Sequence, residues 1–119
     1  MPTIPHTPLV LADKVDLSGV RVRKWAGMTT GDVGEHIILT KFNDRTVHVT
    51  GDFGGGTVVF QGSNDGVEFL PMRDVFNAVV SASEPKLITL TEVPLYVRPA
   101  VTGGTGVSIT AIVCGVGRE

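Results

Sequence analysis

The chain has 119 residues, a formal net charge of −2, 42% hydrophobic residues and 18% charged residues. This length suits one domain, the apolar content argues against a disordered chain, and the charge gives no basis for a nucleic-acid or anionic-membrane partner. A single cysteine excludes an internal disulfide framework and a multi-cysteine metal site.

The N-terminal segment is rich in proline. Pro2, Pro5 and Pro8 rule out a helix and favour an extended conformation. We therefore expect an extended arm over residues 1–15 and a folded domain over residues 16–119. Because such an arm is already extended, it loses little entropy on docking to a neighbouring subunit; the alternative is a frayed terminus. The candidate interface residues in the arm are Ile4, Pro5, Pro8, Leu9, Val10 and Leu11.

Short strand-like segments separated by glycine-rich loops follow the arm. Residues 20–25 alternate valine with arginine, which is typical of a half-buried strand, and residues 35–41 carry a short apolar run. The segment between them, residues 27–34, has the composition of a loop. Trp25, at the end of the predicted strand, and Met28, in the loop beyond it, form a second candidate interface.

The strand pattern continues to the C-terminus. Strands are predicted over residues 46–50, 57–61 and 67–70, and Asn64-Asp65-Gly66 predicts a hairpin turn between the last two. Further strands are expected at 78–83 (weakly), 86–91, 95–101 and 107–116; Pro99 within the third indicates an edge strand or a bulge. This spacing predicts an all-β chain: one β-sandwich or jelly roll of about seven to eight short antiparallel strands.

No pattern typical of a catalytic or cofactor site is present. The three histidines, His6, His36 and His48, lack the short spacing of metal ligands. The carboxylates fall mostly in turns, the glycine runs are not followed by Lys-Ser/Thr, and no serine lies in a Gly-x-Ser-x-Gly motif. We therefore expect no catalytic residues, no metal, no cofactor and no enzymatic activity.

Sugar binding is the alternative that the aromatic residues leave open. Carbohydrate-binding β-sandwiches stack sugars on exposed aromatic rings, and Trp25 and Tyr96 are the two residues here that offer a large ring with a polar tip. Each is more often a core or interface residue.

The second half of the chain resembles a known family. Residues 47–66, with Gly51-Asp52-Phe53-Gly54-Gly55-Gly56 and Gly62-Ser63-Asn64-Asp65-Gly66, together with 94–99 and 102–106, are similar to small β-sandwich proteins encoded among tailed-phage head genes. The resemblance covers about residues 45–113 and consists mainly of turn and strand chemistry. The family usually has an aromatic residue, often tryptophan, shortly after the Asp-Gly turn; Phe69 occupies that place here.

The resemblance implies a virion structural protein, most directly a head decoration (cement) protein on the capsid exterior that is assembled in the host cytoplasm. Its expected partner is the major capsid protein, and it carries over no catalytic residues. Symmetric assembly as a homo-oligomer, a dimer or trimer, is expected on general grounds. No nucleic-acid or membrane partner is expected, and a tail or neck component of the virion is the alternative within the same class.

Overall fold

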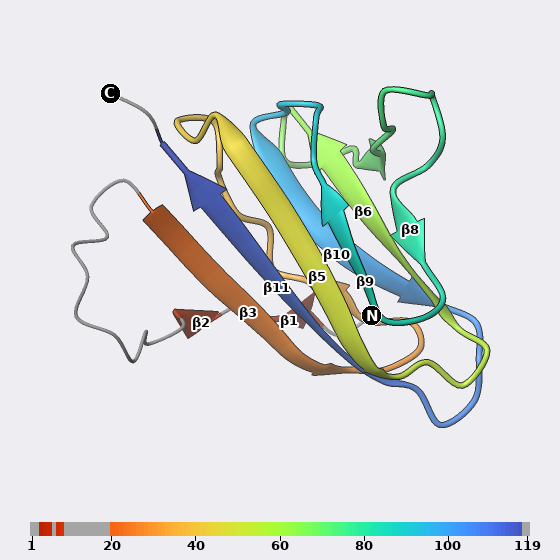
Figure 1. Cartoon of the computed structure of the whole chain (residues 1–119). Coiled ribbons are helices and arrows are strands. Elements are labelled where there is room, and N and C mark those ends of the chain that lie inside the picture. The colour runs from red at the N-terminus through yellow and green to blue at the C-terminus, as the bar shows by residue number, and fades with distance from the viewer. Residues whose placement is uncertain (1–2, 6, 9–19, 118–119) are drawn as a thin grey trace.

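The computed structural model describes residues 3–5, 7–8 and 20–117, and these form two β-sheets that pack face to face (Figure 1). One sheet has six strands, in the order β1-β4-β10-β6-β7 with β8 also paired to β6; the other has five, in the order β2-β3-β11-β5-β9. The strands are β1 (Thr3–Ile4), β2 (Thr7–Pro8), β3 (Val20–Met28), β4 (Val33–Gly34), β5 (Asp44–Asp52), β6 (Thr57–Ser63), β7 (Leu70–Pro71), β8 (Ser81–Ala82), β9 (Lys86–Thr89), β10 (Tyr96–Thr102) and β11 (Ser108–Val116).

The core lies between the two sheets because apolar residues recur at every second position of the long strands. In β11 the side chains of Ile109, Ala111 and Val113 are all buried, while Ser108 is exposed. Successive side chains of a strand point to opposite faces, so this alternation aims one face at the other sheet. The chain is therefore an all-β sandwich, as predicted from the sequence.

The strand count and several strand bounds differ from the sequence prediction: the strand expected at 67–70 is β7 at Leu70–Pro71, and β4 lies in the segment expected to be a loop. The described residues contain eleven strands, because several two-residue strands complete the sheet edges. Residues 35–41 were expected to form a strand, but only Ile37 makes a β-bridge there, to Val97. The apolar side chains of this segment fit the sandwich as a covering loop, with Ile37 and Leu39 buried and Ile38 exposed.

The N-terminal segment is extended, as expected, but its described part pairs with this chain's own sheets. Strand β1 runs parallel to β4, and β2 runs antiparallel to β3, so the segment contributes one strand to each sheet. Both pairings are at sheet edges, where unpaired backbone groups would otherwise remain available to other chains. The boundary expected at residue 15 lies outside the described residues.

Candidate functional site

Trp25 and Met28 are part of the core, so the prediction that they form a surface interface is wrong. Both side chains are fully buried, and the indole Nε1 of Trp25 donates a hydrogen bond of 2.9 Å to the carbonyl oxygen of Glu35. Strand β3 continues through Met28, where a loop was expected, and a register shift in its pairing with β11 lies between Ile109 and Ala111. Burying the Trp25 and Met28 side chains between the sheets stabilises the folded state, because it removes their apolar surface from water.

The candidate residues of the N-terminal segment lie in different environments. Ile4 is half-buried and packs against the core, Pro5 is exposed, and Pro8 is paired with Arg23 of β3. Leu9, Val10 and Leu11 lie outside the described residues. The described part of this segment is thus engaged with its own chain, and a role in reaching a neighbouring subunit stays a prediction for residues 9–11.

The connection from β6 to β8, residues 64–80, exposes several large apolar side chains. Phe76 is 86% exposed and Val67 is 81% exposed, and Leu70 and Val75 are also largely in contact with solvent. Isolated exposed apolar residues are ordinary, and several on one connection make that connection a candidate interaction surface. We call these four residues together with Val79 the apolar connection surface.

A hydrogen-bonded loop over residues 72–80 holds Val75 and Phe76 in place. The Asp74 carboxylate accepts hydrogen bonds from the backbone N–H groups of Phe76 (2.9 Å) and Ala78 (3.0 Å). Arg73 pairs with Val79 across the loop and donates from Nη1 to the carbonyl of Asn77. These bonds fix the backbone before any partner binds, which reduces the entropy lost on binding. The loop projects from the sheet beside β8 (Figure 1).

A second turn holds Val67 in a similar way. Asp65 Oδ1 accepts hydrogen bonds from the backbone N–H groups of Val67 (2.8 Å) and Glu68 (3.0 Å) and from the Ser63 hydroxyl (2.8 Å). These donors, led by the N–H of Val67, hold the pKa of the exposed Asp65 carboxyl below its usual value, because they stabilise its charged form.

A shallow hollow lies beside the apolar connection surface. Its volume is about 320 Å³, and it contains the exposed apolar side chains of Leu70 and Val93. It is lined by Gly62, Asn64, Leu70, Pro71, Met72, Glu92, Val93 and Pro94. Most of these side chains are apolar, so the hollow suits an apolar side chain of a partner better than a reactive substrate.

The outer face of the six-stranded sheet carries an aromatic and cationic cluster. The rings of His36 and Tyr96 meet edge to face at 4.4 Å, and the Arg98 guanidinium lies 3.9 Å from the centre of the Phe69 ring. The Tyr96 ring is also close to Gly66, where an added Cβ would come within 3.2 Å of it. Trp25, in the core, offers no ring for stacking a sugar, whereas Tyr96 is half-buried and lies beside His36 and Gly66.

The apolar connection surface was missed by the sequence prediction, although a signal was present. Val75 and Phe76 stand between Asp74 and Asn77, two residue types that favour turns. A turn places its central side chains in solvent. Asn77 indeed has a positive φ of 63°.

Neither a metal-binding cluster nor a membrane-spanning helix is found among the described residues. In the described ranges no group of three or more histidine, cysteine, aspartate or glutamate side chains is placed to hold a metal ion. The same ranges contain no helix long and apolar enough to cross a membrane.

Comparisons with known proteins identify a structural relative from a prophage. No family model and no curated protein matches the sequence. Among solved structures, the crystal structure of SPBc2 prophage-derived protein YomS superposes with a TM-score of 0.62 at 15% sequence identity, and the match covers 87% of this chain and 99% of that one. The identity is low, so the likeness establishes a shared fold, and that fold occurs in a phage protein.

Proposed function

We propose that this chain is a non-enzymatic virion structural protein of a tailed phage, which decorates the outside of the capsid and cements neighbouring subunits of the major capsid protein. The observation that carries the proposal is the apolar connection surface: large apolar side chains held in solvent on a hydrogen-bonded loop, led by Phe76. Covering such a surface with a partner removes its apolar side chains from water, which makes binding favourable.

The geometry of the rest of the molecule supports the same role. A cement protein adds buried area across seams between capsid subunits, and many symmetric copies act together even where each contact is weak. The rigid sandwich, the docked N-terminal strands and the fold shared with a prophage-derived protein suit such a part. We propose further that the chain acts as a dimer or trimer on the capsid exterior and is assembled in the host cytoplasm without nucleic acid or membrane.

Co-sedimentation with expanded capsids of the cognate phage tests this role. We expect the wild-type chain to pellet with capsids. We expect Phe76→Asp to bind at least tenfold more weakly, because losing an aromatic side chain that the partner buries costs about 2 kcal/mol or more of binding free energy. Leu87→Asp is the matched control: Leu87 is 70% exposed on β9, an edge strand of the other sheet, and we expect its substitution to leave binding intact.

The outcomes test the decoration role and the apolar connection surface separately. Absence of wild-type binding to capsids contradicts the decoration role, and antibody labelling confined to the neck or tail of virions places the chain there instead. Equal binding by Phe76→Asp and wild type contradicts the apolar connection surface. Circular dichroism of both variants confirms that they are folded.

A further inference from the structure

The side chain of Arg45 points toward the mostly apolar space between the sheets. On β5, Arg45 shares a face with Val47 and Val49, and all three are buried, Arg45 to 2% exposure. The alternation of the strand dictates this direction, since Thr46 and His48 occupy the other face. Arginine is almost never fully buried unless its charge is paired.

The Arg45 guanidinium is poorly satisfied by the protein. Its Nη2 donates one long hydrogen bond, 3.3 Å, to the carbonyl oxygen of Leu90. Within residues 3–5, 7–8 and 20–117, the buried side-chain polar atoms without a partner are Arg45 Nε and Nη1. Burial lowers the pKa of Arg45, but a guanidinium stays protonated near neutral pH. A buried cation with unmet donors raises the free energy of the folded state, so a ligand that meets them stabilises it.

The donors that remain match a two-oxygen anion. A guanidinium has five N–H donors, of which two belong to Nη2. Whichever Nη2 hydrogen the Leu90 carbonyl accepts, one edge of the group keeps two parallel N–H donors. Two parallel donors are the arrangement that binds a carboxylate bidentately.

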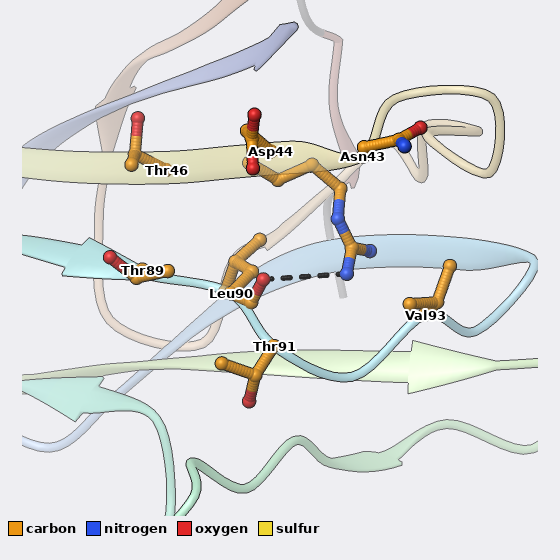
Figure 2. A pocket seen from close by; sticks show the side chains of 8 residues that line it. Asn43, Asp44, Thr46, Thr89, Leu90, Thr91 and Val93 are labelled. Atoms are coloured by element: carbon orange, nitrogen blue, oxygen red, sulfur yellow. Dashed lines mark hydrogen bonds between the residues drawn. The ribbon is translucent and has the colours of Figure 1, made fainter. Parts of the chain in front are cut away.

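A cavity of about 460 Å³ lies at this arginine, between β5 and the segment that follows β9 (Figure 2). Thr89, Thr91 and Asn43 also line it, and Figure 2 shows the hydroxyl oxygens of the two threonines turned away from the guanidinium, which leaves Arg45 as the main donor. It is lined by Asn43, Asp44, Arg45, Thr46, Thr89, Leu90, Thr91 and Val93. Figure 2 shows the single hydrogen bond to Leu90 as a dashed line.

We propose that this cavity binds a carboxylate, with Arg45 as its main ligand. A singly charged carboxylate is preferred to a doubly charged phosphate, because Asp44 also lines the cavity and repels a second negative charge. Because Nε and Nη1 are buried in the ligand-free fold, the guanidinium must turn toward the cavity to bind, and the long bond to Leu90 is the one that it exchanges. The proposal is independent of the virion role. The carboxylate belongs either to a small molecule or to an acidic side chain of a neighbouring protein.

Titration of the full chain by two-dimensional ¹H–¹⁵N NMR, with sodium acetate as the probe, tests the site. We expect saturable shifts of the Arg45 Nε–H signal and of the amides of residues 89–93, and a rise in the unfolding midpoint of about 5 °C at saturation. Sodium chloride at equal ionic strength should cause neither effect. A blocked peptide with one glutamate, used in parallel, distinguishes a protein carboxylate from a small free one.

Three variants make the result decisive. Arg45→Met preserves the length of the side chain without its charge and should abolish the acetate response. Val93→Trp fills the rim of the cavity and leaves Arg45 in place, so it should abolish the response even if Arg45→Met does not fold. Arg73→Met removes an exposed arginine elsewhere and should respond as wild type does. An acetate response that persists in Val93→Trp, does not saturate, or is matched by chloride overturns the proposal.

Discussion

Gly34 lies directly against the ring of Pro99: a Cβ built on Gly34 would stand 2.7 Å from Pro99 Cδ and Cγ, and equally close to Trp25 Cδ1. Real Cβ atoms do not approach other atoms this closely. Because Gly34 has no side chain, Pro99 of β10 and Trp25 of β3 can both pack against it.

Strand β10 contains a proline although it has neighbours on both sides. Pro99 has no N–H to donate, and on the β4 side the pairing steps from Val33–Ala100 to Ile37–Val97, so that residues 34–36 stand opposite residues 98–99. Both backbone groups of Glu35 have other partners: its N–H donates to Ile4 (2.7 Å), and its carbonyl accepts from Trp25 Nε1 (2.9 Å). This irregularity beside Pro99 fits the predicted bulge, and β1 and Trp25 supply the partners of Glu35. Strand β10 itself runs unbroken from Tyr96 to Thr102 between β4 and β6, so the alternative prediction of an edge strand is wrong.

Gly34→Ala should destabilise the protein by about 1–3 kcal/mol, the usual cost of overpacking a core. Denaturant unfolding followed by circular dichroism measures the change. Because Pro99 supplies two of the three closest atoms, the cost should be smaller in a Pro99→Ala background, with a coupling of about 1 kcal/mol. Equal losses in the two backgrounds would show that the ring does not limit the space at residue 34.

Trp25 is the only tryptophan of the chain, and its fluorescence reports its burial. We expect acrylamide to quench the native protein several-fold less than the unfolded chain. Trp25→Phe removes the indole N–H and leaves the Glu35 carbonyl without this donor, which should cost about 1–3 kcal/mol of folding stability. If acrylamide quenched the native protein as efficiently as the unfolded chain, Trp25 would be exposed and its placement in the core would be wrong.

Asp74→Ala should loosen the 72–80 loop without unfolding the sandwich. The backbone N–H groups of Phe76 and Ala78 lose their acceptor, so their hydrogen exchange should accelerate at least tenfold. Global stability should fall by no more than about 1 kcal/mol, because the loop is exposed. Asp74→Asn retains a side-chain oxygen and should show an intermediate effect; unchanged exchange in Asp74→Ala would mean that other contacts fix the loop.

Asp65 should make folding stability depend on pH in the acid range. Its pKa is lower in the folded state than in the unfolded chain, because the N–H groups of Val67 and Glu68 and the Ser63 hydroxyl stabilise the carboxylate. This contribution is fully present above the unfolded value of about 3.9 and is lost as pH falls through the folded pKa.

Carboxyl ¹³C NMR measures the Asp65 pKa, and denaturant midpoints measured at acid pH give the accompanying stability. Asp65→Asn should remove this part of the acid loss and otherwise leave the pH profile unchanged. A folded pKa at or above the ordinary value would contradict the hydrogen-bonded turn.

The sequence by itself determined the all-β class and most of the long strands, because both are local properties. In residues 107–111 apolar residues alternate with polar ones, and this period of two is visible without a fold. The inward direction of Arg45 was readable in the same way, since it keeps step with Val47 and Val49. The turn residues around Phe76 likewise indicated exposure of a loop tip.

Only the tertiary structure decided which apolar residues form the core and which remain in solvent. Trp25 is buried and Phe76 is exposed, although both are aromatic residues next to turn-like sequence. Their difference depends on what lies opposite: Trp25 faces Gly34 and the Glu35 carbonyl, contributed from another part of the chain, whereas Phe76 is held on a loop by Asp74. Such pairings join residues distant in sequence, and local periodicity carries no information about them.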